Sequence, residues 1–393
     1  MISQKPLVAF FVDNKYDLIM VDKKKIAVYA PYFAGGGAEA VELAIVDALQ
    51  HDYKVTLFTF VDVNIDKLNK FYSTNINTQN IKINYILSRP LSKLVTYLSS
   101  NNKFFRAFIL YSVLAHIKYY KDDYDLIISG YNGVDLGKKG IQYLHWVKVV
   151  DGQNNFLAQL FNFSKEQIKE NITITNSNFT AEAVKQVYGL DSTVIYPCVM
   201  LEGSNIPWHE KEDAFICSGR LVMEKAPHRA LNMLKEVRKR GFNIKLYLTG
   251  GTSSIYQSKY YRFLKKVVKE NSDWVTLCEN LSYQEYTQIL NKCKYGIHFK
   301  FEPFGISVAE MMKAGAIPFV KNRGGQMEII GIDNNDLFFE KEKDGIEKIV
   351  DVLKNEEKQK IFRSILNERQ NLFSKEKFSQ EIKKIVDEYI ISI

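Results

Sequence analysis

The chain alternates strand-like and helix-like segments, and this alternation limits its possible folds more than any other feature. From Lys25 an apolar strand (25–33) leads into a glycine loop, an amphipathic helix (38–50) and a second apolar strand (54–60). Strands and helices alternating at this spacing are typical of a parallel, doubly wound sheet. The chain has 393 residues, about twice the length of an average domain. We therefore expect two α/β domains of this kind.

Composition and pattern predict where these domains begin and end. The first domain is predicted to take residues 1–202, with 1–22 as an extra N-terminal segment ahead of the alternation. The stretch 202–213 is polar and has the composition of a linker. A second domain is predicted over residues 203–374, and a last helical segment over residues 375–393.

Cysteine spacing and hydropathy restrict the cellular compartment. The four cysteines form no C-x-x-C pair and no ligand-spaced cluster with the six histidines, so neither a zinc site nor a disulfide framework is expected. The apolar run at residues 7–12 is short and is followed by charged residues, unlike a signal peptide. No run approaches the roughly 18 apolar residues of a membrane span. These patterns predict a cytoplasmic protein.

The stretch 301–328, FEPFGISVAEMMKAGAIPFVKNRGGQME, has the clearest functional pattern. A strand at 295–299 is followed by a turn containing Pro303 and Gly305 and then by a helix. The first turn of a helix exposes unpaired N–H groups and a partial positive charge, which suit a phosphate oxygen. Glu302 and Glu310 flank this turn, and carboxylates accept hydrogen bonds from sugar or ribose hydroxyls.

The pattern E-P-F-G-x4-E-x-M-x2-G-x2-P, followed by G-G-x2-E, resembles the donor site of GT4 retaining glycosyltransferases. This resemblance implies the GT-B fold, in which two doubly wound, Rossmann-like domains face a cleft and a last helix crosses back to the first domain. It also implies that Glu302 binds sugar hydroxyls and Glu310 binds ribose hydroxyls. The donor diphosphate would lie against Phe304, Gly305 and Ile306.

A second group of donor-site residues is expected at the start of the second domain. There a strand runs into Gly219-Arg220, and Lys225 follows five residues later at a predicted helix start. Arginine can bind two phosphate oxygens at once, and lysine adds a point charge. The G-R-x3-E-K pattern resembles the diphosphate motif of GT4 enzymes, in which Ala226 stands where Gly is usual. Gly250, at the end of the next predicted strand, is expected to shape the nucleotide pocket.

The glycine loop at residues 35–37 has two interpretations. Gly35, Gly37 and Ala40 satisfy G-x-G-x-x-A, which would suit a dinucleotide, but three residues separate the glycines from the strand, whereas that motif needs the turn directly on the strand. The sequence GGGAE instead resembles the N-terminal loop of GT4 enzymes. Gly36 and Gly37 would then face the donor phosphates.

His145 ends a predicted strand in the first domain. A lone histidine is most often an ordinary core or rim residue. Its place after the strand that follows D-L-I-I-S, however, resembles the GT4 histidine that faces the donor sugar and the acceptor. The resemblance therefore adds His145 to the predicted catalytic residues Glu302, Arg220 and Lys225.

A basic segment at residues 67–121 holds nine Lys and Arg residues but no Asp or Glu, so the net charge of +8 arises within it. From Leu91 to Tyr120 the charges alternate with apolar residues at helical spacing, which is typical of a basic amphipathic helix on an anionic membrane. A solvated face over a buried stripe is the plain alternative. Nucleic acid is not expected, because no nucleic-acid-binding motif accompanies the charge. The predicted membrane-surface residues are Lys93, Lys103, Arg106 and Lys118.

No metal and no cofactor are expected. Asp123 and Asp125 form a D-x-D pattern, but acids ahead of a strand are commonly capping residues, and the surrounding pattern belongs to a metal-free fold. The resulting hypothesis is a peripheral membrane glycosyltransferase that moves a hexose, with mannose from GDP-mannose as first candidate, to a lipid-linked glycan. The alternatives are an NAD-binding oxidoreductase and a non-catalytic membrane-surface interaction protein.

Overall fold

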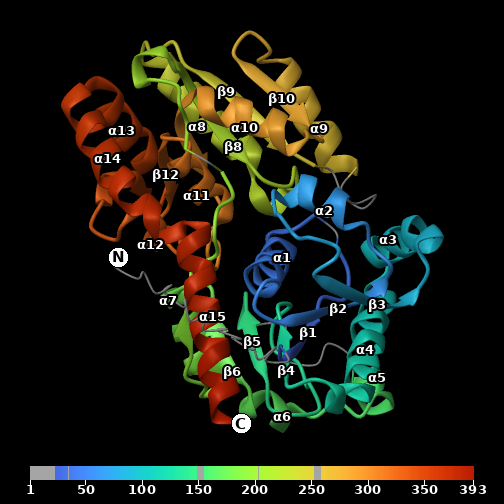
Figure 1. Ribbon diagram of the computed structural model, residues 1–393. Helices are drawn as coiled ribbons and strands as arrows, with labels where there is room; N and C mark the ends of the chain where they lie inside the picture. The colour runs from blue at the N-terminus through green and yellow to red at the C-terminus, as the bar shows by residue number, and fades with distance from the viewer. Residues whose placement is uncertain (1–22, 34, 148–154, 202, 252–257) are drawn as a thin grey trace, which may run out of the picture.

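The structure is a computed structural model, and it describes residues 23–33, 35–147, 155–201, 203–251 and 258–393. These residues form two α/β domains, one above the other in Figure 1. The predicted extra segment, residues 1–22, and the predicted boundary residue 202 lie outside the described residues.

The described part of the first domain contains a seven-stranded sheet in the order β3-β2-β1-β4-β5-β6-β7, and every neighbouring pair is parallel. Its strands are β1 (Lys25–Tyr29), β2 (Lys54–Val61), β3 (Ile81–Leu87), β4 (Leu126–Ser129), β5 (Ile141–Leu144), β6 (Ile172–Thr175) and β7 (Thr193–Val194).

The second domain repeats this topology in its described residues, as a six-stranded parallel sheet in the order β10-β9-β8-β11-β12-β13. Its strands are β8 (Glu212–Ser218), β9 (Lys245–Gly250), β10 (Val275–Glu279), β11 (Cys293–His298), β12 (Ile317–Lys321) and β13 (Phe338–Phe339).

Helices cover both sheets, as expected for parallel strands buried on two faces. Those that lie between the strands of the first sheet are α1 (Gly37–Leu49), α2 (Ile65–Tyr72), α3 (Ser92–Asn101), α4 (Lys103–Tyr119), α5 (Asn155–Leu160), α6 (Lys165–Glu170) and α7 (Asn178–Tyr188). The remaining helices are α8 (Pro227–Lys239), α9 (Ser258–Lys269), α10 (Tyr283–Lys292), α11 (Ile306–Lys313), α12 (Gln326–Ile330), α13 (Glu342–Lys354), α14 (Glu356–Arg369) and α15 (Lys375–Ser392).

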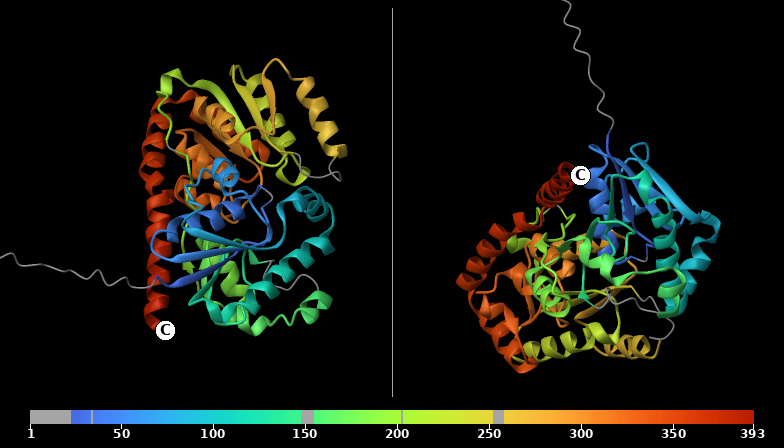
Figure 2. Two further views of the ribbon diagram at one scale, coloured as in Figure 1. Left: turned by 45° about the vertical axis from the view of Figure 1, so that its right-hand side comes forward. Right: turned by 90° about the horizontal axis from the view of Figure 1, so that it is seen from below.

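Strand β1 shows how the first domain buries both faces of its sheet. Successive side chains on a strand point to opposite faces. Ile26 and Val28 pack with α1 and α15, whereas Ala27 and Tyr29 pack with α4. Figures 1 and 2 show α15 running along the first domain although it follows the second domain in sequence. The first domain is therefore completed by the C-terminal end of the described chain.

The strand order reverses once in each sheet, between β1 and β4 and between β8 and β11. In open parallel sheets the crevice at such a switch point, at the carboxyl ends of the strands, is where ligands bind. The glycine loop follows β1, Gly219 follows β8, and the turn at residues 301–305 follows β11. The two predicted phosphate-binding groups of the second domain therefore lie at one switch point, and the glycine loop lies at the other.

Candidate functional site

The donor turn, defined here as Phe301–Gly305, connects β11 to α11. Gly305 has a φ of +109°, and α11 begins directly after it, at Ile306. Behind the turn, the Gly325 N–H donates to the Glu302 carbonyl at 2.9 Å, and a Cβ at Gly325 would overlap the Pro303 carbonyl oxygen. The G-G pair of the motif is thus required by close approach of two backbone segments.

Glu302 is the ionised group of this site. Its carboxylate accepts a hydrogen bond from the Lys225 ammonium, and His298 Nε2 lies 3.4 Å from the same oxygen. Burial opposes ionisation, but the His298 hydrogen bond and the Lys225 charge outweigh it and lower the pKa of Glu302 to about 2. Burial lowers the pKa of His298. At neutral pH the site therefore contains one carboxylate paired with one ammonium.

Arg220 and Lys225 follow β8, but Lys225 does not begin a helix as predicted. It lies in a 3-10 turn, Met223–Lys225, and α8 begins at Pro227 after Ala226, whose φ is +52°. Arg220 is exposed, and no ion-pair partner for its side chain is found among the described residues. Gly219 and Gly250 lie against each other: a Cβ at Gly250 would overlap the Gly219 carbonyl oxygen. Of the two cations in this loop, Lys225 reaches the donor turn and is neutralised by the Glu302 carboxylate.

Glu310 lies one helical turn into α11, apart from the Glu302 ion pair. It accepts a hydrogen bond from the Tyr286 hydroxyl at 2.8 Å, and Tyr283 contributes a second. Burial raises the pKa of Glu310 to about 7, although both hydroxyls act in the opposite direction. The two predicted carboxylates therefore differ chemically, because Glu302 is ionised at neutral pH and Glu310 is close to its titration point.

The glycine loop of the first domain contacts the start of α11 in the second. Gly36 precedes α1, and a Cβ at Gly37 would come 2.8 Å from Ile306 Cδ1. Phe304 is buried against Tyr196 of the first domain, with ring centroids 6.0 Å apart. The predicted donor-binding residues Gly37, Phe304 and Ile306 therefore meet where the two domains face each other.

His145 directly follows β5. Its Nε2 lies 2.8 Å from the Gly130 carbonyl oxygen. A carbonyl only accepts, so Nε2 carries the proton in the neutral ring and Nδ1 is an acceptor. Burial lowers the pKa of His145 to about 4, against the effect of the Gly130 hydrogen bond. His145 is thus neutral at pH 7 and suited to accepting a hydrogen bond from a hydroxyl.

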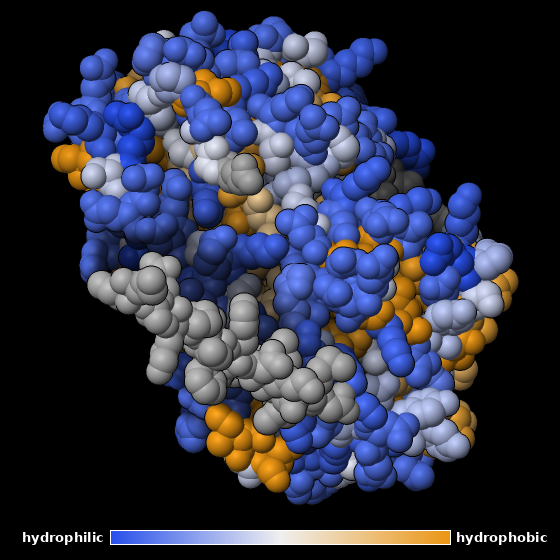
Figure 3. Space-filling view, viewed as in Figure 1, coloured by the Kyte–Doolittle hydropathy of each residue, from blue (hydrophilic) through white to orange (hydrophobic). Residues whose placement is uncertain are grey.

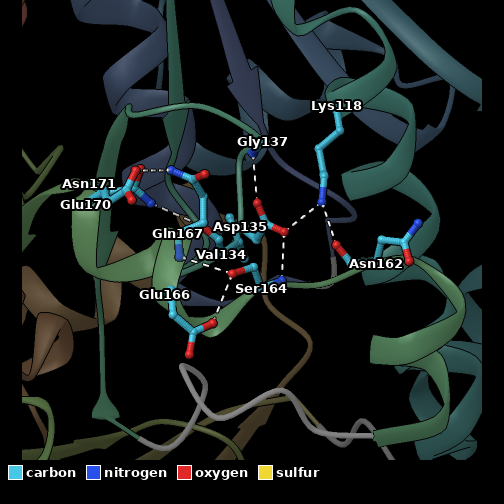
Figure 4. A network of polar contacts seen from close by, with 10 residues as sticks. All are labelled: Lys118, Val134, Asp135, Gly137, Asn162, Ser164, Glu166, Gln167, Glu170 and Asn171. Atoms are coloured by element: carbon cyan, nitrogen blue, oxygen red, sulfur yellow. Dashed lines mark hydrogen bonds and ion pairs between the residues drawn. The ribbon is translucent and has the colours of Figure 1, made fainter.

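The predicted basic amphipathic helix over 91–120 is wrong in two respects. Asn102 divides it into α3 and α4, and α4 buries Ala107, Ile109 and Val113 against the first sheet. Lys118 does not face outward: its ammonium donates to buried Asp135 at 2.6 Å and to the Asn162 carbonyl at 2.9 Å (Figure 4).

Arg106 is also held by the protein, since its Nε donates to the Ser99 carbonyl at 2.9 Å. Lys93 and Lys103 are exposed as predicted. Sequence periodicity could not distinguish the two bonded side chains from the two exposed ones. A basic side chain on a helix can hydrogen-bond to other protein groups or extend into solvent at the same spacing. Only the contacts distinguish Lys118 and Arg106 from Lys93 and Lys103.

Sequence reasoning missed three residues of this region. The sequence placed His298 only within the predicted strand 295–299 and Glu328 only at the end of the G-G-x2-E motif, and it assigned no role in the site to Ser177. In the structure His298 contacts Glu302, and Ser177 and Glu328 connect the two domains. The G-G-x2-E spacing marked Glu328, but no sequence signal paired it with a residue 150 positions away.

Within the described residues, no group of three or more His, Cys, Asp or Glu side chains is placed to hold a metal ion. Among the same residues, no helix combines the length and the hydropathy needed to cross a bilayer.

Comparisons with known proteins agree with this geometry. Residues 202–368 match the family model described as "Glycosyl transferases group 1". Over 235 residues the chain is 24% identical to a GDP-Man:Man(3)GlcNAc(2)-PP-Dol alpha-1,2-mannosyltransferase of Dictyostelium discoideum, covering 55% of this chain and 46% of that protein. The mouse enzyme of the same description is 27% identical over 177 residues, covering 39% and 34%. The chain thus spans about half the length, or less, of these curated relatives.

Solved structures share the fold. Anabaena HepE in complex with UDP and glucose superposes with a TM-score of 0.68 at 16% identity, over 93% of this chain and all of that one. A glycosyltransferase from Rickettsia africae gives 0.65 at 14% identity, over 94% and 99%. The predicted GT-B fold is confirmed. The predicted likeness to GT4 enzymes, and to mannosyltransferases of lipid-linked oligosaccharide assembly, is also confirmed.

Proposed function

We propose that this protein, whose residues 202–368 match the group 1 glycosyltransferase model, is a retaining glycosyltransferase that moves a hexose from a nucleoside diphosphate sugar to a glycan or lipid-linked acceptor. The observation that carries the proposal is the Lys225–Glu302 ion pair, which joins the donor turn to the loop after β8, the loop that also carries exposed Arg220. A cation anchored by a carboxylate, next to a helix N-terminus, is suited to hold a diphosphate and a sugar together.

Each group has a defined role in this proposal. Arg220, Lys225 and the first amides of α11 hold the diphosphate and stabilise its charge as it leaves. The bond from the anomeric carbon to the diphosphate breaks, and the acceptor oxygen bonds to the same face of that carbon. The proton of the acceptor passes to the departing diphosphate. Glu302 and His145 orient the sugar hydroxyls, and Glu310 binds the ribose.

GDP-mannose is the first candidate donor, and a lipid-linked glycan is the first candidate acceptor. The names of the two curated relatives, which contain GDP-Man and PP-Dol, support both candidates. We propose no metal and no cofactor, because two cations and backbone amides supply the positive charge that a diphosphate requires.

A lipid-linked acceptor requires the protein to reach a membrane surface, and we propose that α3 provides the contact. Leu91, Leu94 and Tyr97 recur at intervals of three, and their exposed fractions are 43%, 55% and 56%. Lys93 on α3 and Lys103 at the start of α4 are exposed as well. Figure 3 shows hydrophobic side chains gathered at the right-hand edge of the molecule, around α3 and the start of α4. Apolar side chains flanked by lysines suit an anionic bilayer rather than nucleic acid.

Thermal unfolding with UDP, GDP, ADP or NAD, each in EDTA, tests the proposal. A ligand at about 100 times its dissociation constant stabilises a protein by roughly 2.7 kcal/mol, which moves the midpoint by several degrees. We expect a shift with one nucleoside diphosphate, and its loss in Arg220→Gln but not in the control Arg240→Gln. Arg240 is an exposed arginine that pairs with Glu347. A shift with NAD alone, or with none of the four, would refute the proposal.

A further inference from the structure

The N-terminal end of α7, in the first domain, touches the donor turn of the second. Ser177 is the N-cap of α7 and is fully buried. Its hydroxyl accepts the Thr180 N–H at 3.0 Å, as N-cap residues do. The same oxygen lies 2.5 Å from the Pro303 carbonyl oxygen, to which it donates. One hydroxyl thus caps a helix in one domain and fixes the backbone of the donor turn in the other.

Glu328 makes the second contact, from α12. Its carboxylate accepts the backbone N–H groups of Asn178 at 2.9 Å and Phe179 at 2.8 Å. The Tyr196 hydroxyl donates to it as well, at 2.9 Å. The first N–H groups of a helix have no partner within the helix, and a carboxylate there also interacts favourably with the helix dipole. An acidic residue of the second domain therefore completes a helix of the first.

Glu328 is itself rigidly held. Arg369 donates from Nη2 to the Glu328 carbonyl at 2.5 Å and from Nε to the Ile329 carbonyl at 2.9 Å. The two glycines that precede α12 lie against the backbone of Glu302 and Pro303. Residues 324–328 therefore connect α7 to the donor turn, because the glycines contact the turn and Glu328 contacts α7.

The same end of α7 also reaches the first-domain side of the site. Asn176 donates from Nδ2 to the His145 carbonyl at 3.1 Å, and Trp146 stacks on Phe179 with ring centroids 5.7 Å apart. Phe179 in turn contacts Phe301 edge-on at 6.4 Å. The short segment 176–179 therefore touches both the His145 segment and the donor turn, through Asn176, Ser177 and Phe179.

We propose that Ser177 and Glu328 are positioning residues, which hold the donor turn opposite His145 so that the sugar and the acceptor hydroxyl meet in one geometry. This inference rests on the proposed function. A displacement of about 1 Å between reacting groups can reduce a rate about 100-fold without removing any group that touches substrate. The expected signature is therefore a lower rate of transfer with the donor still bound.

The test uses Ser177→Ala and Glu328→Gln, with Ser177→Thr as the conservative variant. The matched control is Glu342→Gln, which breaks an exposed ion pair with Arg229 inside the second domain. Three quantities are measured: the Kd for the nucleoside diphosphate that stabilises the parent, the kcat of transfer at saturating donor, and the ratio of donor hydrolysis to transfer.

We expect Ser177→Ala and Glu328→Gln to keep the nucleotide Kd within about twofold, to lower kcat by about 10- to 100-fold and to raise the hydrolysis ratio. Ser177→Thr should restore kcat, and Glu342→Gln should match the parent. If both variants fold and transfer as fast as the parent, the contact is only structural and the inference is overturned. If the parent itself neither binds a nucleotide nor transfers sugar, the proposed function is refuted. That result differs from one in which the parent is active and the variants match it, which refutes only the positioning role.

Discussion

The ammonium of Lys225 is bonded to the carboxylate of Glu302, and these two residues come from loops after different strands, β8 and β11, on either side of the switch point. This ion pair directly connects the group proposed to bind the sugar, Glu302, with a group proposed to bind phosphate, Lys225. An ammonium has three N–H donors, so two remain for phosphate oxygens while one is held by Glu302.

Replacing Glu302 with Gln should remove transfer while leaving nucleotide binding. The amide keeps the size of the carboxyl group but cannot anchor the Lys225 charge, and it offers a weaker acceptor to the sugar hydroxyls. We expect kcat to fall at least 100-fold, with the nucleoside diphosphate Kd changed by less than about fivefold. Initial-rate kinetics and calorimetric titration measure the two quantities, and turnover within a few-fold of the parent would contradict the assignment.

The Glu302 pKa also predicts a dependence of stability on pH. Because the folded-state pKa is depressed to about 2, the stabilisation is fully present above the unfolded pKa near 4.5 and is lost as the pH falls toward 2. Denaturant unfolding between pH 6 and pH 3 should therefore show a shallower loss of stability in Glu302→Gln than in the parent. Parallel curves for the two proteins would argue against a perturbed Glu302.

Nucleotide affinity should depend on the ionisation of Glu310. Its pKa of about 7 means that the carboxylate, the better acceptor for ribose hydroxyls, prevails only above neutral pH. We expect affinity for the nucleoside diphosphate to fall about tenfold from pH 8 to pH 6, by the titration of one group. Part of any change comes from the diphosphate itself, so the comparison is with Glu310→Gln, in which the Glu310 contribution must disappear.

The same titration acts on the free protein in the opposite direction. A carboxyl whose folded pKa is raised binds its proton more tightly in the folded state, so stability declines as the pH rises from about 4.5 to about 7. Glu310→Gln should remove this decline. Identical pH dependence of the unfolding midpoint in the variant and the parent would show that Glu310 titrates normally.

Ala226→Gly should stabilise the protein. Ala226 has a φ of +52°, in the left-handed region where a Cβ costs about 1 kcal/mol. We expect a gain of about 0.5–1 kcal/mol, measured as an increase of a few degrees in the unfolding midpoint. Ala181→Gly, inside α7, is the control and should lose about as much, because its backbone is helical. A lower midpoint for Ala226→Gly would contradict this prediction.

Phe378→Ala should destabilise the first domain. Phe378 lies on α15 but is buried, with 2% exposure, in the core formed by β1 and α1. Truncating a buried phenylalanine costs about 3–5 kcal/mol. The unfolding midpoint measured by calorimetry should fall by several degrees, while Tyr119→Ala, at an 81% exposed position, should leave it unchanged. An unaffected midpoint would show that α15 does not complete this domain.

The sequence by itself determined the fold class and indicated the residues of a candidate donor site. Strand and helix periods are local properties of the chain, so the alternation after Lys25 sufficed to predict parallel sheets. Glu302, Gly305, Arg220 and Lys225 were predicted because each lies within a short motif of fixed spacing. Such motifs are readable because backbone geometry at a strand end permits few residues.

Only the tertiary structure decided which groups bond to one another, because side-chain contacts between distant segments leave no periodic signal. It turned Lys118 inward to Asp135 and divided the basic segment at Asn102, neither of which the charge pattern indicated. It also gave Glu302 and Glu310, carboxylates of one motif, different pKa values: His298 and the Lys225 ammonium lower the pKa of Glu302, whereas burial raises that of Glu310. The joining of Ser177 and Glu328 across the domains likewise became visible only once the chain was folded.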